Sequence, residues 1–382
     1  MAERIGIIGA GISGLALGCI LKLNSIDCIM FERSSKISEY GAGISVSPNG
    51  LILLDKIGVL SQLRNNSCRP INVVWRKTNG LPFNTMPLKD IGKVITMNRK
   101  EFIKALHDKY VDLGGEILFD HELEKIDENK LILSFKNLET FQVTHVVGCD
   151  GIKSSIRFNS FYSSKDPQYS GFTAWRGIGS SDSKNINVYL GPGSHVVCYP
   201  VNDKLDTSFV GVIKTNKMSE ESWRREGMHQ ELSDDLKIYD QFIHSLFNSS
   251  DKVYKWGLYV RPPLKNIIKK NITLMGDAAH PMLPFLGQGA CMAIEDAFIF
   301  GSLCKKFENN FESIQKNYQK LRLKRTNDVQ KSSELQASLN HLANPFLIGI
   351  RNFLLKNTNI ALRRTRNIYN YDALNEVTKI SI

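Results

Sequence analysis

The chain has 382 residues, of which 42% are hydrophobic and 23% are charged, so it can bury a substantial core and divide into about two domains. The formal net charge of +11 favours anionic partners, but Lys and Arg are spread along the chain without a long basic run. We therefore expect a solvated basic surface and no nucleic-acid partner.

The apolar stretches and the cysteines indicate the cellular location that is expected for the protein. No apolar run reaches the roughly 18 residues of a membrane-crossing helix, and glycines interrupt the apolar N-terminus, so neither secretion nor membrane spanning is expected. The seven cysteines stand at least nine residues apart, which excludes Cys-x-x-Cys pairs for zinc, redox chemistry or haem. This spacing predicts free thiols, a reducing cytoplasmic location and no metal site.

The first predicted elements are a strand, a tight turn and a helix. Residues 4–8, Arg-Ile-Gly-Ile-Ile, form a mainly apolar run that leads into the turn Gly9-Ala10-Gly11-Ile12-Ser13-Gly14, and apolar residues at helical spacing follow. In such a turn Gly9 permits the bend, Gly11 lets a pyrophosphate approach the backbone, and Gly14 lets helix and strand close up. The helix N-terminus then favours the anionic phosphates.

A second apolar strand, residues 26–32, ends at Glu32, 18 residues after Gly14. A carboxylate at this point is placed to accept hydrogen bonds from the ribose hydroxyls of an adenosine. Glycine-rich turns also arise for steric reasons alone, but the flanking strands and Glu32 favour a dinucleotide site.

The middle of the chain reads mainly as strands. Strands 73–76 and 94–97 are expected to flank a turn at Asn79-Gly80, and Asn98 is expected to cap a helix over 99–113. The other expected elements are a helix at 51–60, strands at 116–119, 131–135, 141–147, 172–176, 187–190, 196–201, 207–213 and 253–256, and a polar helix at 231–247. The irregular sheet from about residue 171 onward is of a kind that walls a ligand cavity.

The last third returns to an apolar strand at 271–277, which ends at Asp277. Residues 284–290, Pro-Phe-Leu-Gly-Gln-Gly-Ala, then run into a bare helix start, and helices are expected at 290–304 and 312–339. Backbone N–H groups from Gly287 to Ala290 would face an acceptor such as a flavin pyrimidine carbonyl. The nearby acids Glu295 and Asp296 are attributed to the helix dipole.

Three separated stretches resemble the signature motifs of the class A flavoprotein monooxygenases, the group that contains para-hydroxybenzoate, salicylate and 3-hydroxybenzoate hydroxylases and zeaxanthin epoxidase. They are the glycine turn with Glu32, the run Cys149-Asp150-Gly151 through Arg157, and residues 276–297. The resemblance covers nearly the whole chain. It implies a mixed α/β fold in which a Rossmann-like FAD-binding domain carries a β-sheet substrate domain, as in para-hydroxybenzoate hydroxylase.

The resemblance also implies a bound FAD and the residues that hold it. Glu32 would bind the adenosine ribose, Arg99 would lie near the diphosphate and ribityl chain, and Asp277 would hold the ribityl chain or pyrophosphate. Asp150-Gly151 would serve both FAD and a passing NADH or NADPH. The full set of implied FAD-binding residues is Gly9, Ala10, Gly11, Ser13, Gly14, Glu32, Arg33, Gly43, Ile44, Arg99, Asp150, Gly151, Asp277, Pro284, Gly287, Gln288, Gly289 and Ala290.

The sequence holds no second Gly-x-Gly-x-x-Gly, so NAD(P)H would visit, deliver a hydride and leave. The family implies that the reduced flavin combines with O₂ to form a C4a-hydroperoxide, which transfers one oxygen atom to an aromatic or apolar small molecule in a pocket that excludes water. Two alternatives stay open. One is a flavoprotein reductase or dehydrogenase of a lipid-like substrate, and the other is a non-catalytic flavin-binding partner protein.

A phenolic substrate would benefit from a nearby base, for which the candidates are His195, Tyr199 and His280. Each has a structural alternative, since His195 fits a surface turn, Tyr199 fits packing beneath the flavin, and His280 fits a role in orienting its own loop. By resemblance, Pro284 lines the reaction site through its carbonyl. Phe285 stands where several phenol hydroxylases carry a histidine or another polar residue, which favours a more apolar substrate.

The chain is expected to divide into a discontinuous FAD-binding domain, a β-sheet substrate domain and a C-terminal helical segment, and to form a monomer or a homodimer. The boundaries are 1–70, 98–170 and 270–340 for the first domain, 71–97 and 171–269 for the second, and 341–382 for the segment. The apolar and basic tail fits either a peripheral membrane contact or a helix folded back over the FAD domain, and the folded-back helix is favoured.

Overall fold

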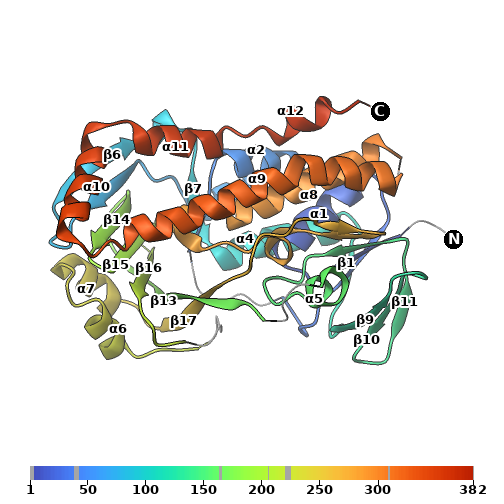
Figure 1. Ribbon diagram of the computed structural model, residues 1–382, viewed down its shortest axis with the longest axis horizontal. Coiled ribbons are helices and arrows are strands. Elements are labelled where there is room, and N and C mark those ends of the chain that lie inside the picture. The colour runs from blue at the N-terminus through green and yellow to red at the C-terminus, as the bar shows by residue number, and fades with distance from the viewer. Residues whose placement is uncertain are drawn as a thin grey trace.

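The computed structural model describes residues 4–37, 43–162, 166–204, 206–219, 225–308 and 310–381. Two large sheets occupy opposite halves of an elongated molecule, and the long helix α9 (Phe311–Asn340) runs along both halves (Figure 1).

The first large sheet has six strands and gathers distant parts of the chain. All adjacent pairs are parallel except the edge pair β18–β19. In spatial order the strands are β18 (Ile268–Lys269), β19 (Ile272–Leu274), β12 (His145–Gly148), β1 (Ile5–Ile8), β2 (Cys28–Phe31) and β8 (Glu116–Leu118). Every residue of β1, β2 and β12 is buried, as expected for parallel strands covered on both faces.

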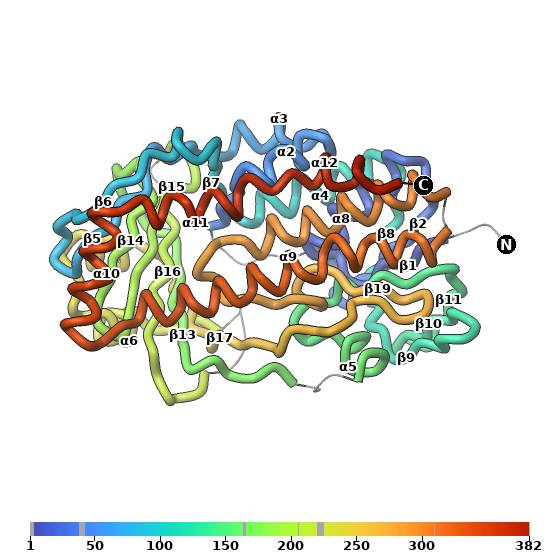
Figure 2. The backbone as a smooth tube through the Cα atoms, turned by 45° about the horizontal axis from the view of Figure 1, so that its top comes forward, coloured from blue at the N-terminus to red at the C-terminus, as the bar shows by residue number. Residues whose placement is uncertain are grey.

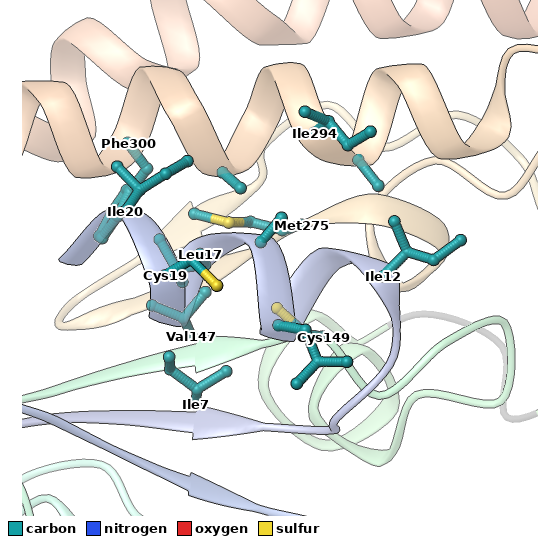
Figure 3. Close-up of a cluster of buried hydrophobic side chains, with 14 of the residues drawn as sticks. Ile7, Ile12, Leu17, Cys19, Ile20, Val147, Cys149, Met275, Ile294 and Phe300 are labelled. Carbon is teal, nitrogen blue, oxygen red and sulfur yellow. The ribbon is translucent and has the colours of Figure 1, made fainter. Parts of the chain in front are cut away.

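Helix α1 (Ile12–Leu23) lies between this sheet and α8 (Gly289–Lys306) and supplies much of the core (Figure 3). Leu17 of α1 belongs to the same buried cluster as Ile7 of the sheet and Phe300 of α8. The two helices approach closely because Gly301 has no side chain, since a Cβ there would stand 2.5 Å from Cγ2 of Ile20.

Other helices and two small sheets surround this core. The expected cap of α4 (Arg99–Asp112) is confirmed, because Oδ1 of Asn98 accepts a hydrogen bond of 3.0 Å from the Lys100 N–H. The remaining elements of this half are α2 (Pro48–Ile57), α3 (Leu60–Arg64), α5 (Ser155–Phe161), and the antiparallel sheets β3 (Gly43–Val46)–β7 (Ile95–Asn98)–β4 (Ser67–Cys68) and β9 (Leu123–Asp127)–β10 (Ile132–Phe135)–β11 (Thr140–Gln142).

The second large sheet has seven strands, antiparallel apart from the pair β5–β14. In spatial order they are β17 (Val253–Val260), β13 (Gln168–Ser180), β16 (Asp206–Lys214), β15 (Ser194–Pro200), β14 (Ile186–Gly191), β5 (Asn72–Arg76) and β6 (Pro82–Pro87). One face packs on α6 (His229–Asp235) and α7 (Gln241–Asn248). Val196 and Cys198 point to that face, so the alternate residues of β15 point to the other.

Three expectations about these elements were wrong. Strands 73–76 and 94–97 do not flank one turn as partners, since β5 pairs with β6 and β7 joins the small sheet. Prolines at both ends of β6 masked its strand character. The expected helix 231–247 is two helices, with Asp240 capping the second, and the expected strand 141–147 is divided between β11 and β12.

The C-terminal segment forms three helices, α10 (Pro345–Asn357), α11 (Ile360–Tyr369) and α12 (Ala373–Thr378). α10 contacts β6 at the far end of the second large sheet, while α11 returns past α2 and α12 reaches α8 (Figures 1 and 2). Within the described residues, no helix has the length and apolar character needed to cross a membrane.

Candidate active site

The glycine turn between β1 and α1 forms a cradle with one open position. Gly9 has a φ of +104°, and a Cβ there would stand 2.5 Å from the Cys149 carbonyl oxygen. A Cβ on Gly14 would overlap the Gly9 carbonyl oxygen. A Cβ on Gly11 would meet nothing within 4 Å. Gly9 and Gly14 are therefore required by the fold, whereas Gly11 keeps space free at the N-terminus of α1, where backbone N–H groups attract phosphate. This cradle fits a dinucleotide pyrophosphate.

Glu32, at the end of β2, is held directly beside this turn. Its Oε2 accepts a hydrogen bond of 2.9 Å from the Ala10 N–H, and its Oε1 accepts one of 2.9 Å from the Ser34 N–H. The structure thus fixes the carboxylate that was predicted to bind ribose next to the predicted pyrophosphate cradle. Arg33 follows it on the exposed surface.

The second motif follows β12, next to the glycine turn. Oδ2 of Asp150 accepts hydrogen bonds of 3.3 Å from Ser155 Oγ and the Ile156 N–H, while its buried Oδ1 has no partner among the described residues. Burial raises the pKa of this carboxyl above its ordinary value. Gly151 has a φ of +76° and open space around its Cα. A buried polar atom without a partner suits a site that a ligand completes.

Arg157 joins the second motif to the third, a role that the sequence analysis missed. It is buried and donates hydrogen bonds to the carbonyls of Ala279 at 2.9 Å and Pro262 at 2.6 Å. Burial lowers the pKa of its guanidinium to about 10, so it stays protonated at neutral pH. The final arginine of the motif therefore positions the segment after Asp277.

The third motif turns back onto the first and then reaches the small sheet. Gly276, with a φ of +54°, packs so closely on α1 that a Cβ would lie 3.0 Å from Cβ of Ser13. Asp277, in the short 3₁₀ helix η2 (Gly276–Ala278), is exposed. After the second 3₁₀ turn, η3 (Pro284–Leu286), Gly287 has a φ of +61° and its Cβ position is 3.1 Å from Oγ of Ser45 in β3. Pro284 and Gly287 are exposed, and Gly289 and Ala290 are partly exposed.

Gln288 belongs to the same predicted set but points inward. Its Nε2 donates a hydrogen bond of 2.9 Å to Ser47 Oγ, and its Oε1 accepts one of 3.1 Å from Asn49 Nδ2. Because its side-chain amide is used inside the protein, only its backbone is available to a ligand.

A buried ion cluster joins α8 to α9. It consists of Glu295 and Asp296 from α8 and Arg322 from α9. All three side chains are fully buried, and Arg322 donates hydrogen bonds of 2.7 Å to Glu295 and 2.6 Å to Asp296. Arg325 adds a contact of 3.1 Å to Glu295. The helix dipole is therefore the wrong explanation for these acids, because α9 supplies their counter-charge.

His280 orients its own loop. Its Nε2 lies 2.5 Å from Oδ2 of Asp296, which also accepts a hydrogen bond of 2.9 Å from the Gly276 N–H. Burial alone would raise the pKa of Asp296, but His280 and Arg322 lower it to about 2. This arrangement supports the positioning role that was the alternative to catalysis for His280.

An aromatic cluster of His195, His341, Phe172 and Phe285 lies at the face of the seven-stranded sheet opposite α6 and α7, where Leu283 and Ala337 also pack. Ring centroids of Phe285 lie 5.3 Å from His195 and 5.6 Å from Phe172, so η3 of the third motif touches the second large sheet here. Nδ1 of His195 lies 3.0 Å from Nε2 of His341, and Nδ1 of His341 lies 2.7 Å from the Ala337 carbonyl oxygen. His195 is buried rather than at a surface turn. His341, 146 residues away in sequence, carried no local signal.

Tyr199, four residues after His195 on β15, lies where the two halves of the protein meet. A Cβ on Gly43 would stand 2.7 Å from its Cε2, and the Gly43 N–H donates a hydrogen bond of 2.9 Å to Ser208 Oγ. Burial raises the pKa of Tyr199 to about 12, so it keeps its proton at neutral pH. Ile44 follows Gly43 as a buried residue, and Arg99 begins α4 nearby in a half-buried position. Gly41 and Ala42, which precede Gly43 in the sequence, lie outside the described residues.

Comparison with known proteins agrees with this cradle. Residues 3–333 match the family described as FAD binding domain. The chain belongs to this family. It is similar to the 3-amino-4-hydroxybenzoate 2-monooxygenase PtmB3 of Streptomyces platensis, with 27% identity over 356 residues and 89% of each chain covered. It is also similar to salicylate hydroxylase of Pseudomonas putida, with 26% identity over 398 residues that cover 94% of this chain and 91% of the other.

Solved structures share the fold. HpxO of Klebsiella pneumoniae, complexed with FAD and uric acid, superposes with a TM-score of 0.84 at 20% identity and 96% coverage of each chain. A salicylate hydroxylase substrate complex superposes with a TM-score of 0.83 at 22% identity, covering 98% of this chain and 97% of the other. The predicted mixed α/β fold, membership of the flavoprotein monooxygenases and use of FAD are confirmed.

Proposed function

We propose that this enzyme is an NAD(P)H- and O₂-dependent hydroxylase of a small aromatic molecule that carries a hydroxyl group. The observation that carries this proposal is the contact of Phe285 with His195 and Phe172. It brings the third motif against the face of the second large sheet opposite α6 and α7. A planar ring is the shape that such an aromatic cluster packs against best.

The FAD would lie along the cradle already described, with its diphosphate at Gly11, its ribose at Glu32 and its ribityl chain near Asp277 and Arg99. Its ring would face the backbone from Gly287 to Ala290. When bound and reduced by NAD(P)H, FAD supplies the oxygen activation, and the protein supplies position and electrostatics. The absence of a second glycine fingerprint in the sequence supports a transient visit by NAD(P)H.

The hydrogen bonds of the two histidines support an assignment of the protons on their rings. A carbonyl can only accept, so Nδ1 of His341 carries a proton toward Ala337. Burial lowers the pKa of His341 to about 4, so its ring is neutral and Nε2 accepts from Nδ1 of His195. Burial also holds the pKa of His195 well below its ordinary value, which leaves its Nε2 unprotonated.

His195 Nε2 is therefore an acceptor for the hydroxyl of the substrate. A hydrogen bond to this nitrogen increases electron density on the phenol ring and fixes which carbon meets the oxygen donor. Because its pKa is so low, His195 orients the hydroxyl and does not store its proton. Tyr199, which stays protonated, can donate a hydrogen bond but does not act as a base, and Pro284 lines the site through its carbonyl.

The relatives support the substrate class, since their names describe hydroxylation of 3-amino-4-hydroxybenzoate, 3-hydroxybenzoate and salicylate. We also propose the two-domain division given by the sequence, with residues 71–97 and 171–269 binding the substrate. The seven cysteines, all described and all free thiols, support a cytoplasmic location. A monomer or homodimer stays the proposed assembly.

The test is a screen of hydroxylated benzoates and pyridines for compounds that accelerate NAD(P)H oxidation by the holoenzyme. We expect oxygen uptake and a product that gains one atom from isotopically labelled O₂. A stimulated reaction that consumes no O₂ and yields a reduced or dehydrogenated product would instead support the alternative flavoprotein reductase or dehydrogenase. Flavin binding without any stimulated turnover would favour a non-catalytic partner.

A further inference from the structure

The outward face of α10 is apolar, which is unusual for a surface helix. Its exposed side chains include Phe346, at 75% of its maximal accessible surface, and Phe353, at 64%. The exposed apolar side chains, named here the α10 face, are Phe346, Leu347, Ile350, Phe353 and Leu354. At 3.6 residues per turn they occupy one continuous sector of about 120° around the helix.

The inward side of the same helix is mixed, because the half-buried Ile348, Asn352 and Leu355 lie beside Arg351. Arg351 is its one buried residue among those described, and it donates a hydrogen bond of 3.0 Å to the Leu339 carbonyl at the end of α9. The helix is thus anchored through an arginine, while the five side chains of the α10 face point away from the protein. An exposed contiguous apolar face of this kind marks an interaction surface.

The stretch of chain that contains α10 carries no acidic side chain. Between Glu334 and Asp372 the sequence contains no Asp or Glu and five basic residues, which are Arg351, Lys356, Arg363, Arg364 and Arg366. Lys356 and Arg363 are exposed and have no ion pair among the described residues. α10 stands at the end of the molecule opposite both termini (Figures 1 and 2), so a flat partner can reach it.

From these observations we propose that the α10 face docks this enzyme onto a lipid surface that carries anionic headgroups. The phenylalanine and leucine side chains enter the interface between headgroups and acyl chains, and the flanking basic side chains pair with lipid phosphates. A second copy of the chain suits the face less well, because a two-fold interface would bring two acid-free basic segments together. This inference is independent of the proposed substrate.

The test is co-sedimentation of the FAD-loaded enzyme with vesicles. We expect binding to vesicles of phosphatidylglycerol and phosphatidylcholine in equal parts, weaker binding to phosphatidylcholine alone, and release by added salt. The double variant Phe346→Asp/Phe353→Asp is expected to lower the apparent affinity at least about tenfold, since it removes both apolar anchors and adds negative charge.

The control is Leu138→Asp, which places one negative charge on an exposed leucine, at 91% accessibility, in the turn between β10 and β11 at the other end of the molecule (Figure 1). It is expected to bind vesicles as the wild type does. FAD content and circular dichroism report folding for every variant. Wild-type enzyme that stays in the supernatant, or a double variant that binds as well as the control, refutes the proposal. A wild-type dimer in size-exclusion chromatography that the double variant converts to a monomer also refutes it, because the face is then a self-association surface.

Discussion

The N–H of Gly276 donates a 2.9 Å hydrogen bond to Asp296, so the start of the third motif is attached to a carboxylate inside α8. The same carboxylate is held by Arg322 at 2.6 Å. The turn that contains Asp277 thus depends on a buried ion cluster between α8 and α9.

Arg322→Met is expected to lower the free energy of unfolding by about 3–5 kcal/mol, because it leaves Glu295 and Asp296 as buried charges without their main partner. Urea unfolding followed by circular dichroism measures this loss. The control on the same helix is Lys324→Met, which breaks an exposed pair with Asp328 and is expected to change stability by less than about 1 kcal/mol. If the two substitutions lower the free energy of unfolding equally, the buried cluster stabilises the fold no more than an exposed ion pair does.

Gly11→Val is expected to give a folded protein that cannot load FAD. Its new side chain meets no protein atom near the Cβ position, but it fills the space in front of the α1 N-terminus. Absorbance of the purified protein and flavin titration measure loading, while the melting temperature reports folding without added FAD.

Gly14→Ala is the contrasting variant, because its Cβ would overlap the Gly9 carbonyl and disturb the fold itself. We expect it to unfold at lower temperature whether or not flavin is added. Normal flavin content in Gly11→Val would contradict the placement of the diphosphate at this turn.

Asp277→Ala is expected to weaken FAD affinity about 10- to 100-fold, the cost of losing a hydrogen bond from the ligand to a charged group. The exposure of Asp277 next to the well-held Gly276 motivates this role. Equilibrium titration of apoprotein with FAD measures it. Asp55→Ala, an exposed acid on α2, is the control and should leave the affinity unchanged.

Local sequence was sufficient to predict the cofactor cradle but not the supports behind it. The turn from Gly9 to Gly14 and the acid at Glu32 are each defined by neighbours in sequence, so their conformation follows from steric rules and strand patterning. Arg157, Arg322 and His341 act on partners 26 to 146 residues away, and no periodicity records such pairings.

The seven-stranded sheet illustrates the same limit. Most of its strands were located from alternating apolar residues, yet the partner of β5 was misjudged because the prolines of β6 suppress strand propensity at an edge. Val196 packs in the cluster with α6 and α7, so the side chain of His195, its neighbour on β15, points to the other face of the sheet. This direction follows from tertiary packing, which the local sequence does not record.

His341→Phe tests the orienting role of the histidine pair. Phenylalanine keeps the ring packing against Phe172 and Phe285 but removes the acceptor that fixes Nδ1–H of His195. With FAD content unchanged, we expect kcat/KM for the hydroxylated substrate to fall about a hundredfold and a larger share of consumed NAD(P)H to end as hydrogen peroxide. His341→Gln restores an acceptor and should recover part of the loss. If His341→Phe forms as much hydroxylated product per NAD(P)H consumed as the wild type, His341 contributes only packing and does not orient His195.

The buried histidines also predict how stability depends on pH. Burial lowers the pKa of His145 to about 3 and that of His341 to about 4, and it holds the pKa of His195 well below its ordinary value. In the unfolded chain each of them binds a proton near pH 6.5, so the unfolded state holds more protons below that pH. Stability should therefore fall as the pH drops from about 6.5 toward 4, by up to about 1.4 kcal/mol per pH unit for each histidine.

Asp296 acts in a separate window. Because the folded protein lowers its pKa to about 2, the stability it contributes is present above its unfolded value near 3.9 and is lost between about pH 4 and 2.

Urea unfolding at pH 7, 6 and 5 measures the contribution of the histidines to the pH dependence of stability, because Asp296 stays ionised over this range. His341→Phe removes one of the three and should reduce the slope in that range by about one third. An identical slope in this variant would mean that His341 is already protonated in the folded protein, and the acceptor assigned to its Nε2 would then be wrong.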